Sequence, residues 1–367
     1  MINLFALRLY LGNHPHYISR FITDICRIWL WRLHRQPIVV LTTESGGLGD
    51  YVWFRNYYDV IREHYNPKQC RIIVIGMGQW TDFVNAADRK PNKNHLDIYR
   101  AFETPDNPLK IEAFFFRLFK ADVYIDFRER YLRNLVKTKK YYSGKGYKET
   151  KQFYETANNI VINKWFPLPN RFKHKLPLVP IAAKERRTAL EKPYVVVAEK
   201  GNTQGALSDE QTTLIVQLIL SQGYNVFYNG NRNNLINNLT KKNIVFSQSN
   251  IIDGYLYPLT EYFTITSQCV YVVTVNTFIY HLAIQSNKPL VVISVNEYES
   301  IDLKANNQIV VFNKELMEAY KEGSLDCYKV NKAIGLKDID CKSIEIAINQ
   351  INKQIIHNVG IRNSHNI

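Results

Sequence analysis

The chain has 367 residues, of which 46% are hydrophobic and 22% charged, so it suits two globular domains and argues against wholesale disorder. A formal net charge of +14 favours polyanionic partners: nucleic acid, an anionic membrane surface or phosphorylated substrates. We expect no nucleic acid, because the sequence has no zinc-finger spacing, no RNP-like motif and no dense Lys/Arg block.

The cysteines and the lengths of the apolar runs indicate in which cellular compartment the protein resides. Five cysteines without a CxxC pair are typical of reduced thiols rather than of a disulfide framework: Cys26, Cys70, Cys269, Cys327 and Cys341. No apolar run reaches the roughly 20 residues that span a bilayer. Charges interrupt every apolar stretch before Gln36, so no signal peptide is expected. These features predict a cytoplasmic protein.

Residues 17–34 predict an amphipathic helix within an N-terminal segment, 1–36. Apolar side chains recur at helical spacing and arginines lie between them: Ile18, Phe21, Ile22, Ile25, Ile28, Trp29 and Leu33, with Arg20, Arg27, Arg32 and Arg35. A basic amphipathic helix with tryptophan can lie peripherally in an anionic membrane interface. It can equally dock on the protein's own core, which is the commoner outcome.

The next part of the chain alternates strands with helical patterns. Continuous β-branched runs predict buried strands at 37–43, 71–76 and 121–127, with a helix starting near residue 50 and continuing through 65. This alternation is typical of a parallel sheet with helices on both faces. It predicts a Rossmann-like domain over residues 37–175.

Prolines accumulate between about residues 163 and 193, which marks a linker, and the alternation then restarts. Strands are expected at 194–198, 224–228, 269–275 and 289–294, with helices at 208–222, between the last two strands, and at 342–354. We predict a second Rossmann-like domain over 190–340, then a terminal helix and loose tail over 341–367. The fold class is therefore α/β, with two parallel-sheet domains facing a cleft and ligands at the carboxyl ends of the strands.

The first candidate site is the loop after the first strand, with Gly46, Gly47 and Gly49 ahead of Asp50. Glycines there let the backbone turn tightly and approach a ligand, and the next helix offers its positive N-terminus. The spacing matches neither the dinucleotide fingerprint nor the P-loop. Asp50 can be the N-cap of that helix, or a general base toward an acceptor hydroxyl.

Two further loops follow predicted strands in the second half. In the loop after strand 269–275, Asn276 or Thr277 can cap the next helix, and its free N–H groups would face an anion such as a diphosphate. His281, one turn further on, can donate to phosphate or sugar, although a lone histidine on a helix is usually structural. The loop after strand 194–198 carries Lys200 and Thr203, which can hold phosphate or belong to an ordinary connection. All three loops are expected at carboxyl ends of parallel strands, where one cleft could collect them.

These stretches resemble the ADP-heptose:lipopolysaccharide heptosyltransferase family, glycosyltransferase family nine, which has the two-Rossmann GT-B fold. The resemblance rests on the segment GGLGD at 46–50 and on the run CVYVVTVNTFIYHLAIQSNKP at 269–289, which is similar to the family's strand, D-[ST]-G-x-x-H turn and helix. The order and spacing of elements from about residue 37 to 352 also agree. The resemblance implies that residues 37–175 form the acceptor domain and residues 190–340 the nucleotide-sugar domain. The N-terminal helix and the tail lie outside it.

Carried onto this sequence, the resemblance implies that Asp50 removes the proton of an acceptor hydroxyl while that oxygen attacks the anomeric carbon with inversion. Thr277 and His281 fall where the family contacts the donor's phosphates, and Lys200 and Thr203 lie in its other phosphate-binding loop. The implied partners are a nucleotide-sugar and a glycan or glycolipid of the cell envelope. No metal and no cofactor beyond the donor are implied, because helix N-termini and side chains would neutralise the diphosphate.

The sequence departs from the family's pattern in the second half. Asn276 stands where the family has Asp, Phe278 stands where it has Gly, and the Glu expected after Gly230 to hold the ribose is missing. An inactive relative that binds a glycan or a partner protein is therefore one alternative. A nucleotide-sugar epimerase on the same architecture is another.

Overall fold

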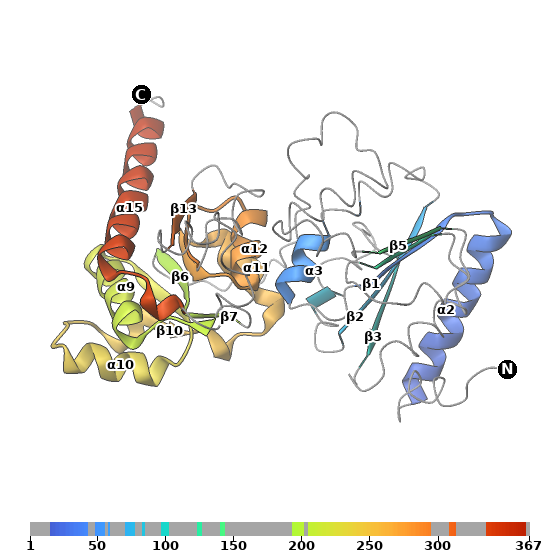
Figure 1. Cartoon of the computed structure of the whole chain (residues 1–367), viewed down its shortest axis with the longest axis horizontal. Helices are drawn as coiled ribbons and strands as arrows, with labels where there is room; N and C mark the ends of the chain where they lie inside the picture. The colour runs from blue at the N-terminus through green and yellow to red at the C-terminus, as the bar shows by residue number, and fades with distance from the viewer. Residues whose placement is uncertain are drawn as a thin grey trace, which may run out of the picture. The chain divides into compact units, whose positions relative to one another are not determined.

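The computed structural model describes residues 15–42, 48–55, 58, 70–77, 83–84, 97–102, 123–126, 140–143, 193–201, 205–294, 308–312 and 335–364. The chain divides into two compact units, Met1–Ala182 and Ala183–Ile367, each with its own parallel sheet (Figure 1).

The N-terminal unit is built on a five-stranded parallel sheet in the order β3-β2-β1-β4-β5. Its strands are β1 (Ile38–Thr42), β2 (Arg71–Met77), β3 (Ile98–Phe102), β4 (Val123–Asp126) and β5 (Lys140–Ser143). The strands predicted at 37–43, 71–76 and 121–127 are confirmed as β1, β2 and β4. This strand order is that of a Rossmann fold, in which the chain starts in the middle of the sheet and builds outward in both directions.

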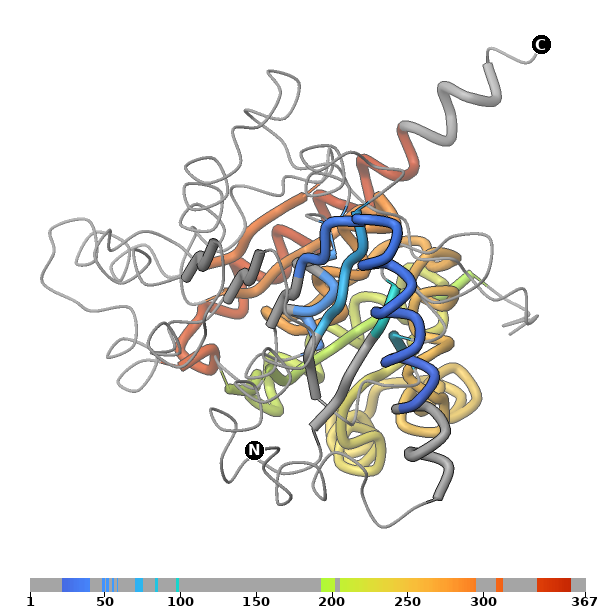
Figure 2. The backbone as a smooth tube through the Cα atoms, turned by 90° about the vertical axis from the view of Figure 1, so that its right-hand side faces the viewer, coloured from blue at the N-terminus to red at the C-terminus, as the bar shows by residue number. Residues whose placement is uncertain are grey.

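Two helices are described beside this sheet. Helix α2 (Pro15–Leu33) lies along it in both views, and it is the blue helix nearest the viewer in Figure 2. Its Ile28 side chain is buried, so the predicted helix does dock on the protein. Helix α3 (Leu48–Phe54) follows β1. Within the described ranges, no helix is long and apolar enough to cross a lipid bilayer.

The C-terminal unit has a six-stranded parallel sheet in the order β10-β9-β6-β11-β12-β13. Its strands are β6 (Tyr194–Ala198), β9 (Asn225–Asn229), β10 (Ile251–Asp253), β11 (Val272–Val275), β12 (Leu290–Ile293) and β13 (Gln308–Val311). The four strands predicted for this half are confirmed as β6, β9, β11 and β12. Counted along this unit, the order is 3-2-1-4-5-6, the full Rossmann arrangement.

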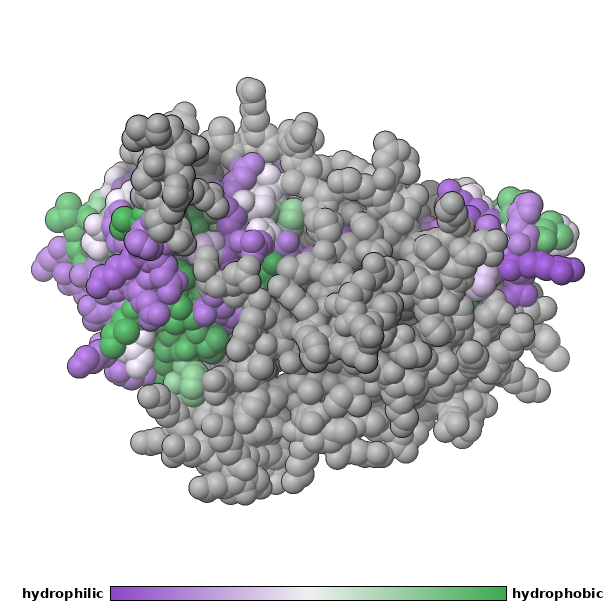
Figure 3. Space-filling view, turned by 90° about the horizontal axis from the view of Figure 1, so that it is seen from above, coloured by the Kyte–Doolittle hydropathy of each residue, from purple (hydrophilic) through white to green (hydrophobic). Residues whose placement is uncertain are grey.

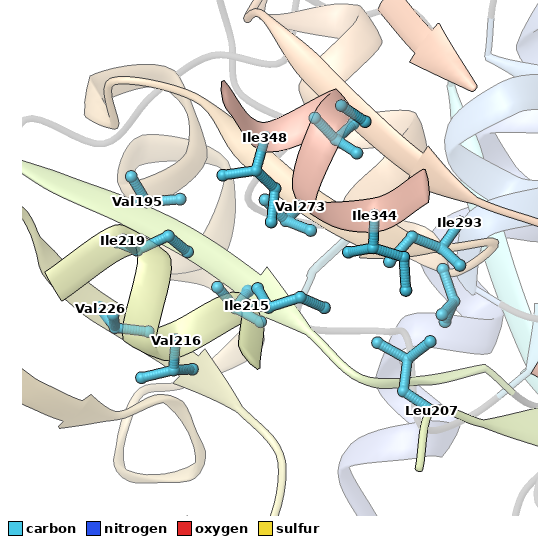
Figure 4. Packing of buried hydrophobic residues seen from close by; sticks show 14 of the residues in the cluster. Val195, Leu207, Ile215, Val216, Ile219, Val226, Val273, Ile293, Ile344 and Ile348 are labelled. Carbon is cyan, nitrogen blue, oxygen red and sulfur yellow. The ribbon is translucent and has the colours of Figure 1, made fainter. Parts of the chain in front are cut away.

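Helices cover both faces of this sheet (Figure 1). On one face lie α9 (Asp209–Ser221), α10 (Arg232–Lys241) and α15 (Cys341–Ser364), and on the other lie α11 (Tyr262–Gln268) and α12 (Phe278–Gln285). Helices α9, α10 and α15 pack on alternate residues of the strands and form one apolar cluster with them. In this cluster Ile344 and Ile348 lie beside Val273 (Figure 4). Because every residue of β6 is buried, this strand forms the middle of the unit's core.

Capping fixes the ends of the best-predicted helix. Ser208 accepts a hydrogen bond from the Gln211 N–H, and the Gln211 side chain accepts one from the Ser208 N–H, so a capping box starts α9 where the sequence predicts it. The side-chain Nε2 of Gln211 also donates to the carbonyls of Leu336 and Ile339, at 2.9 and 2.6 Å. That bond pair joins α9 to the segment preceding α15. Helix α15 continues to Ser364, where the sequence analysis expected a loose tail.

Candidate functional site

The candidate site of the C-terminal unit lies at the carboxyl ends of β6 and β11. These neighbouring strands occupy the point where the strand order reverses, and such a switch point is where open parallel sheets bind ligands. The loops that follow them meet directly. A Cβ added to Gly201 would lie 2.5 Å from the carbonyl oxygen of Asn276, so only glycine allows this approach. Two of the three loops singled out from the sequence therefore share one site.

The loop after β6 forms a small antiparallel hairpin, β7 (Lys200–Gly201) with β8 (Gly205–Ala206). Gly205 has a φ of 88°, in the left-handed region that favours glycine. The Lys200 side chain is exposed at the start of the hairpin, next to the residue that contacts Asn276. Thr203 lies outside the described residues.

The loop after β11 leads into the N-terminus of α12. Thr277 is the N-cap, as one of the two interpretations of this loop predicts: its Oγ1 accepts the Ile279 N–H at 3.1 Å, and its carbonyl accepts the Tyr280 N–H. Among the described residues none accepts the Phe278 N–H, so the first turn keeps one backbone donor for an anion. Asn276 immediately precedes the cap and supplies the carbonyl against Gly201.

The ring of Phe278 packs sideways on Tyr262 of α11. The two centroids are 5.4 Å apart, and the Tyr262 ring also meets Phe227 edge to face. Tyr262 is itself held by its hydroxyl, which lies 2.8 Å from the carbonyl oxygen of Gly254 and 3.2 Å from Oδ1 of Asn229. Phe278 thus continues an aromatic row along this face of the unit. This row accommodates the bulky Phe278 side chain at the start of α12.

His281 is half-buried in α12, with the edge of the Tyr280 ring beside it. Its Nδ1 is buried and makes no hydrogen bond within the described part of the chain. Burial lowers the pKa of the imidazole from 6.5 to about 3. At neutral pH His281 is therefore uncharged: it can donate one hydrogen bond but brings no positive charge to a phosphate.

The sequence analysis did not single out Glu199, which joins the loops after β6 and β9. Its carboxylate accepts hydrogen bonds from the Tyr228 hydroxyl and from the Asn231 N–H, the latter at 3.2 Å. Burial and the bond to Glu199 raise the pKa of Tyr228 above its usual range. A Cβ at Gly230 would come within 2.5 Å of this carboxylate, so the glycine leaves room for it. The signal in the sequence was a single acidic residue directly after a fully buried strand.

The glycine-rich loop of the N-terminal unit is only partly described. Gly46 and Gly47 lie outside the described residues, and Gly49 is buried in α3. Helix α3 begins at Leu48, so Asp50 is its third residue and lies in the first turn rather than at the N-cap position. The helix follows β1, whose neighbour on one side is β4, so Asp50 belongs to the switch point of its own sheet.

Comparison with known proteins shows which solved structures share this architecture. No protein-family model matches the chain, and no curated protein matches it in sequence. Solved structures do match. A family 9 glycosyl transferase from Veillonella parvula DSM 2008 is 14% identical, with a TM-score of 0.59 over 86% of this chain and 97% of that one. The ADP-heptose lps heptosyltransferase II of E. coli is 12% identical, with a TM-score of 0.60 over 87% and 99%.

A third similar structure is the iron-containing dodecameric glycosyltransferase TibC from enterotoxigenic E. coli H10407. It is 12% identical, with a TM-score of 0.52 over 87% of this chain and 77% of that one. All three matches span both units of the present chain, and identities this low establish the fold alone. The resemblance seen in the sequence is thus confirmed at the level of architecture, and the chain has the two-Rossmann GT-B fold of the family-nine glycosyltransferases.

Proposed function

We propose that the protein is an inverting glycosyltransferase that moves a sugar from a nucleotide-sugar to a hydroxyl of a cell-envelope glycan or glycolipid. The observation that carries this proposal is the contact of Gly201 with Asn276, which brings two anion-binding loops together at the switch point of a Rossmann sheet. The fold is that of structures described as ADP-heptose and family 9 transferases, which supports a nucleoside diphosphate as the leaving group and a heptose as one candidate sugar.

The donor's diphosphate is assigned to the start of α12. The unengaged Phe278 N–H and the positive end of the helix would face the phosphate oxygens, with the exposed Lys200 ammonium adding a full charge. Thr203 and the rim formed by Asn276 and Thr277 belong to the same proposed site. These groups supply the charge neutralisation that the leaving diphosphate needs, so the proposal includes no metal.

Glu199 is the proposed partner of the donor's ribose. The resemblance places such a glutamate after Gly230, and the Glu199 carboxylate reaches that position from the neighbouring loop. Each of its oxygens accepts one hydrogen bond from the protein and keeps a lone pair for a ribose hydroxyl. The missing family glutamate is thereby replaced in space by a residue from another strand end.

In the proposed reaction Asp50 is the general base. Its carboxylate takes the proton of the acceptor hydroxyl while that oxygen forms a bond to the anomeric carbon. The bond from this carbon to the diphosphate oxygen breaks with its electron pair, and the configuration inverts. Gly46, Gly47 and Gly49 would let the backbone approach the acceptor.

The experiment is thermal stabilisation by a panel of ADP-, UDP-, GDP-, CMP- and dTDP-linked compounds. A nucleotide that binds only the folded state raises the melting temperature, by about 2.7 kcal/mol of stability at a hundredfold excess over Kd. We expect one nucleoside diphosphate to stand out, and Glu199→Gln to weaken its effect more than that of inorganic pyrophosphate. An absence of any shift with well-folded protein would contradict the proposal.

The second candidate is a protein of this fold that binds without catalysis. A specific feature favours it. The Thr277 hydroxyl is already hydrogen-bonded within its own helix, and His281 is uncharged, so two residues of the implied phosphate site would add little to the binding of phosphate. Stabilisation by an oligosaccharide without stabilisation by any nucleotide would support this alternative.

A further inference from the structure

Helix α2 has two apolar faces, of which the protein uses one. The inner face is anchored: Ile28 and Asp24 are buried at 5% and 3% exposure, and Trp31 lies under the Arg71 guanidinium, 5.4 Å from the ring centroid. At the end of the helix, the Gln36 N–H donates to the Trp31 carbonyl, and its side chain accepts from Arg71 at 2.8 Å. The helix is therefore fixed to the start of β2.

The outer face carries an exposed apolar stripe. Ile22, Cys26, Trp29 and Leu33 follow one another at spacings of four, three and four residues, which puts them on one side of the helix, with Leu30 beside them. The four large side chains of this set are each more than half exposed, and the cysteine is exposed as well. Green and purple residues adjoin at the right-hand end of the space-filling view, where α2 lies (Figure 3). An apolar stripe of this kind marks an interaction surface.

The charges beside the apolar stripe of α2 indicate which partner binds it. Asp24 is the sole acidic residue in the sequence of α2, and it is buried, so the exposed surface of this helix offers only positive charge. Arg27 is exposed along one edge of the stripe, and Arg35 is exposed just beyond its end. The whole chain adds a net charge of +14. An apolar stripe bearing tryptophan beside a basic edge matches the interface of an anionic lipid bilayer.

Arg27 is the residue best placed to meet a lipid phosphate. It lines a shallow pocket with Trp31, Arg71 and Asp97. Arg71 is already committed there, because it forms an ion pair with Asp97 at 3.0 Å as well as its bond to Gln36. Arg27, in contrast, makes no ion pair or hydrogen bond among the described residues, so its guanidinium is available.

We infer that the outer face of α2 is a peripheral docking surface for an anionic membrane, with Ile22, Trp29, Leu30 and Leu33 inserted among the lipids and Arg27 on a headgroup phosphate. The helix lies in the plane of the interface and does not cross the bilayer. This surface is independent of sugar transfer: it would bring the protein to a lipid-borne acceptor, and it would serve a binding protein equally.

The test is flotation of the full chain with vesicles of phosphatidylcholine alone and of equal parts phosphatidylcholine and phosphatidylglycerol, without nucleotide. We expect binding to the anionic vesicles, weakened by salt because surface charges are screened. The double variant W29S/L33S should bind about tenfold more weakly or worse, since each side chain gives up apolar burial. Arg27→Gln should lower binding about fivefold. None of these exposed changes should alter the melting temperature.

The matched control is V245S/I356S, which removes two large exposed apolar side chains, 97% and 60% exposed, from the C-terminal unit. It should bind vesicles like the parent protein. Equal loss in this control and in W29S/L33S would overturn the proposal, as would no binding to anionic vesicles at low salt. Light scattering of the parent and W29S/L33S tests whether a second copy of the chain binds the stripe instead. A parent that is a dimer and a variant that is a monomer would show this.

Discussion

The two sheets share the strand order 3-2-1-4-5, to which the C-terminal sheet adds a sixth strand, but the loop after the first strand differs between them. In the C-terminal unit that loop folds into the β7–β8 hairpin, and Gly201 presses against Asn276 at the start of α12. In the N-terminal unit β1 leads instead to α3, whose first turn carries Asp50. In the proposed function, one switch point binds the diphosphate of the donor and the other carries the general base, Asp50. The same topology can therefore supply the two halves of a transfer reaction, an electrophile site and a base.

The strongest test of this contrast is Asp50→Asn. If the N-terminal switch point supplies the base, transfer should fall by about 10²- to 10⁴-fold, the usual range for a general base. Donor binding should stay nearly unchanged, because the proposed diphosphate site belongs to the other sheet. Steady-state turnover and nucleotide-induced stabilisation measure the two effects separately. Near-full turnover in this variant would remove Asp50 from the mechanism.

The second test addresses the C-terminal loop contact with Gly201→Ala. The added methyl would lie 2.5 Å from the Asn276 carbonyl oxygen, so the hairpin or the α12 N-terminus must move. We expect a loss of about 1–3 kcal/mol in the free energy of unfolding, typical of overpacking, together with weaker donor binding. Urea unfolding and nucleotide titration measure these.

Gly335→Ala is the control for that variant. A Cβ at Gly335 would find its nearest neighbour, Cγ of Lys337, at an ordinary 3.6 Å. Its φ of −98° suits any residue. It should leave donor binding unchanged. If both alanine variants behave alike, the contact between the two loops is not what shapes the site.

Sequence patterns were most informative where a strand is buried on both sides. The run Tyr194–Ala198 is continuous and apolar, and β6 occupies those residues. Edge strands carried less signal: β5 is a short KYYS, β10 a three-residue IID, and β3 holds Arg100 at its centre, so none has an uninterrupted apolar run. Their pairing is decided by the neighbouring strand, which a linear pattern does not contain.

The sequence predicted where the loops of the candidate site lie, but not which side chains contact one another there. Strand ends told us that the loops at Lys200 and Thr277 lie at one edge of the sheet. The role of Glu199 depends on Tyr228 at the end of β9 and on Asn231 in the loop after it, so its position directly after a buried strand did not reveal its hydrogen-bond partners. Phe278 departs from the glycine of the family's pattern, and the sequence did not show that its ring packs on Tyr262 of α11, which is a tertiary contact.

The smallest expected effect concerns charge at the C-terminal site, where His281 is uncharged. Its pKa is lowered to about 3 in the folded chain, whereas the unfolded chain protonates near 6.5. The unfolded state therefore binds the proton first as pH falls, and stability is lost with decreasing pH below 6.5. Because the side chain is only half-buried, we expect at most about 2 kcal/mol of loss from His281 between pH 7 and 5. Urea unfolding of the parent and of His281→Phe across that range measures it, with the variant showing the flatter slope. Identical slopes would mean that His281 binds its proton at the same pH in the folded and the unfolded chain, and below pH 6.5 it could then place a positive charge beside the proposed diphosphate site.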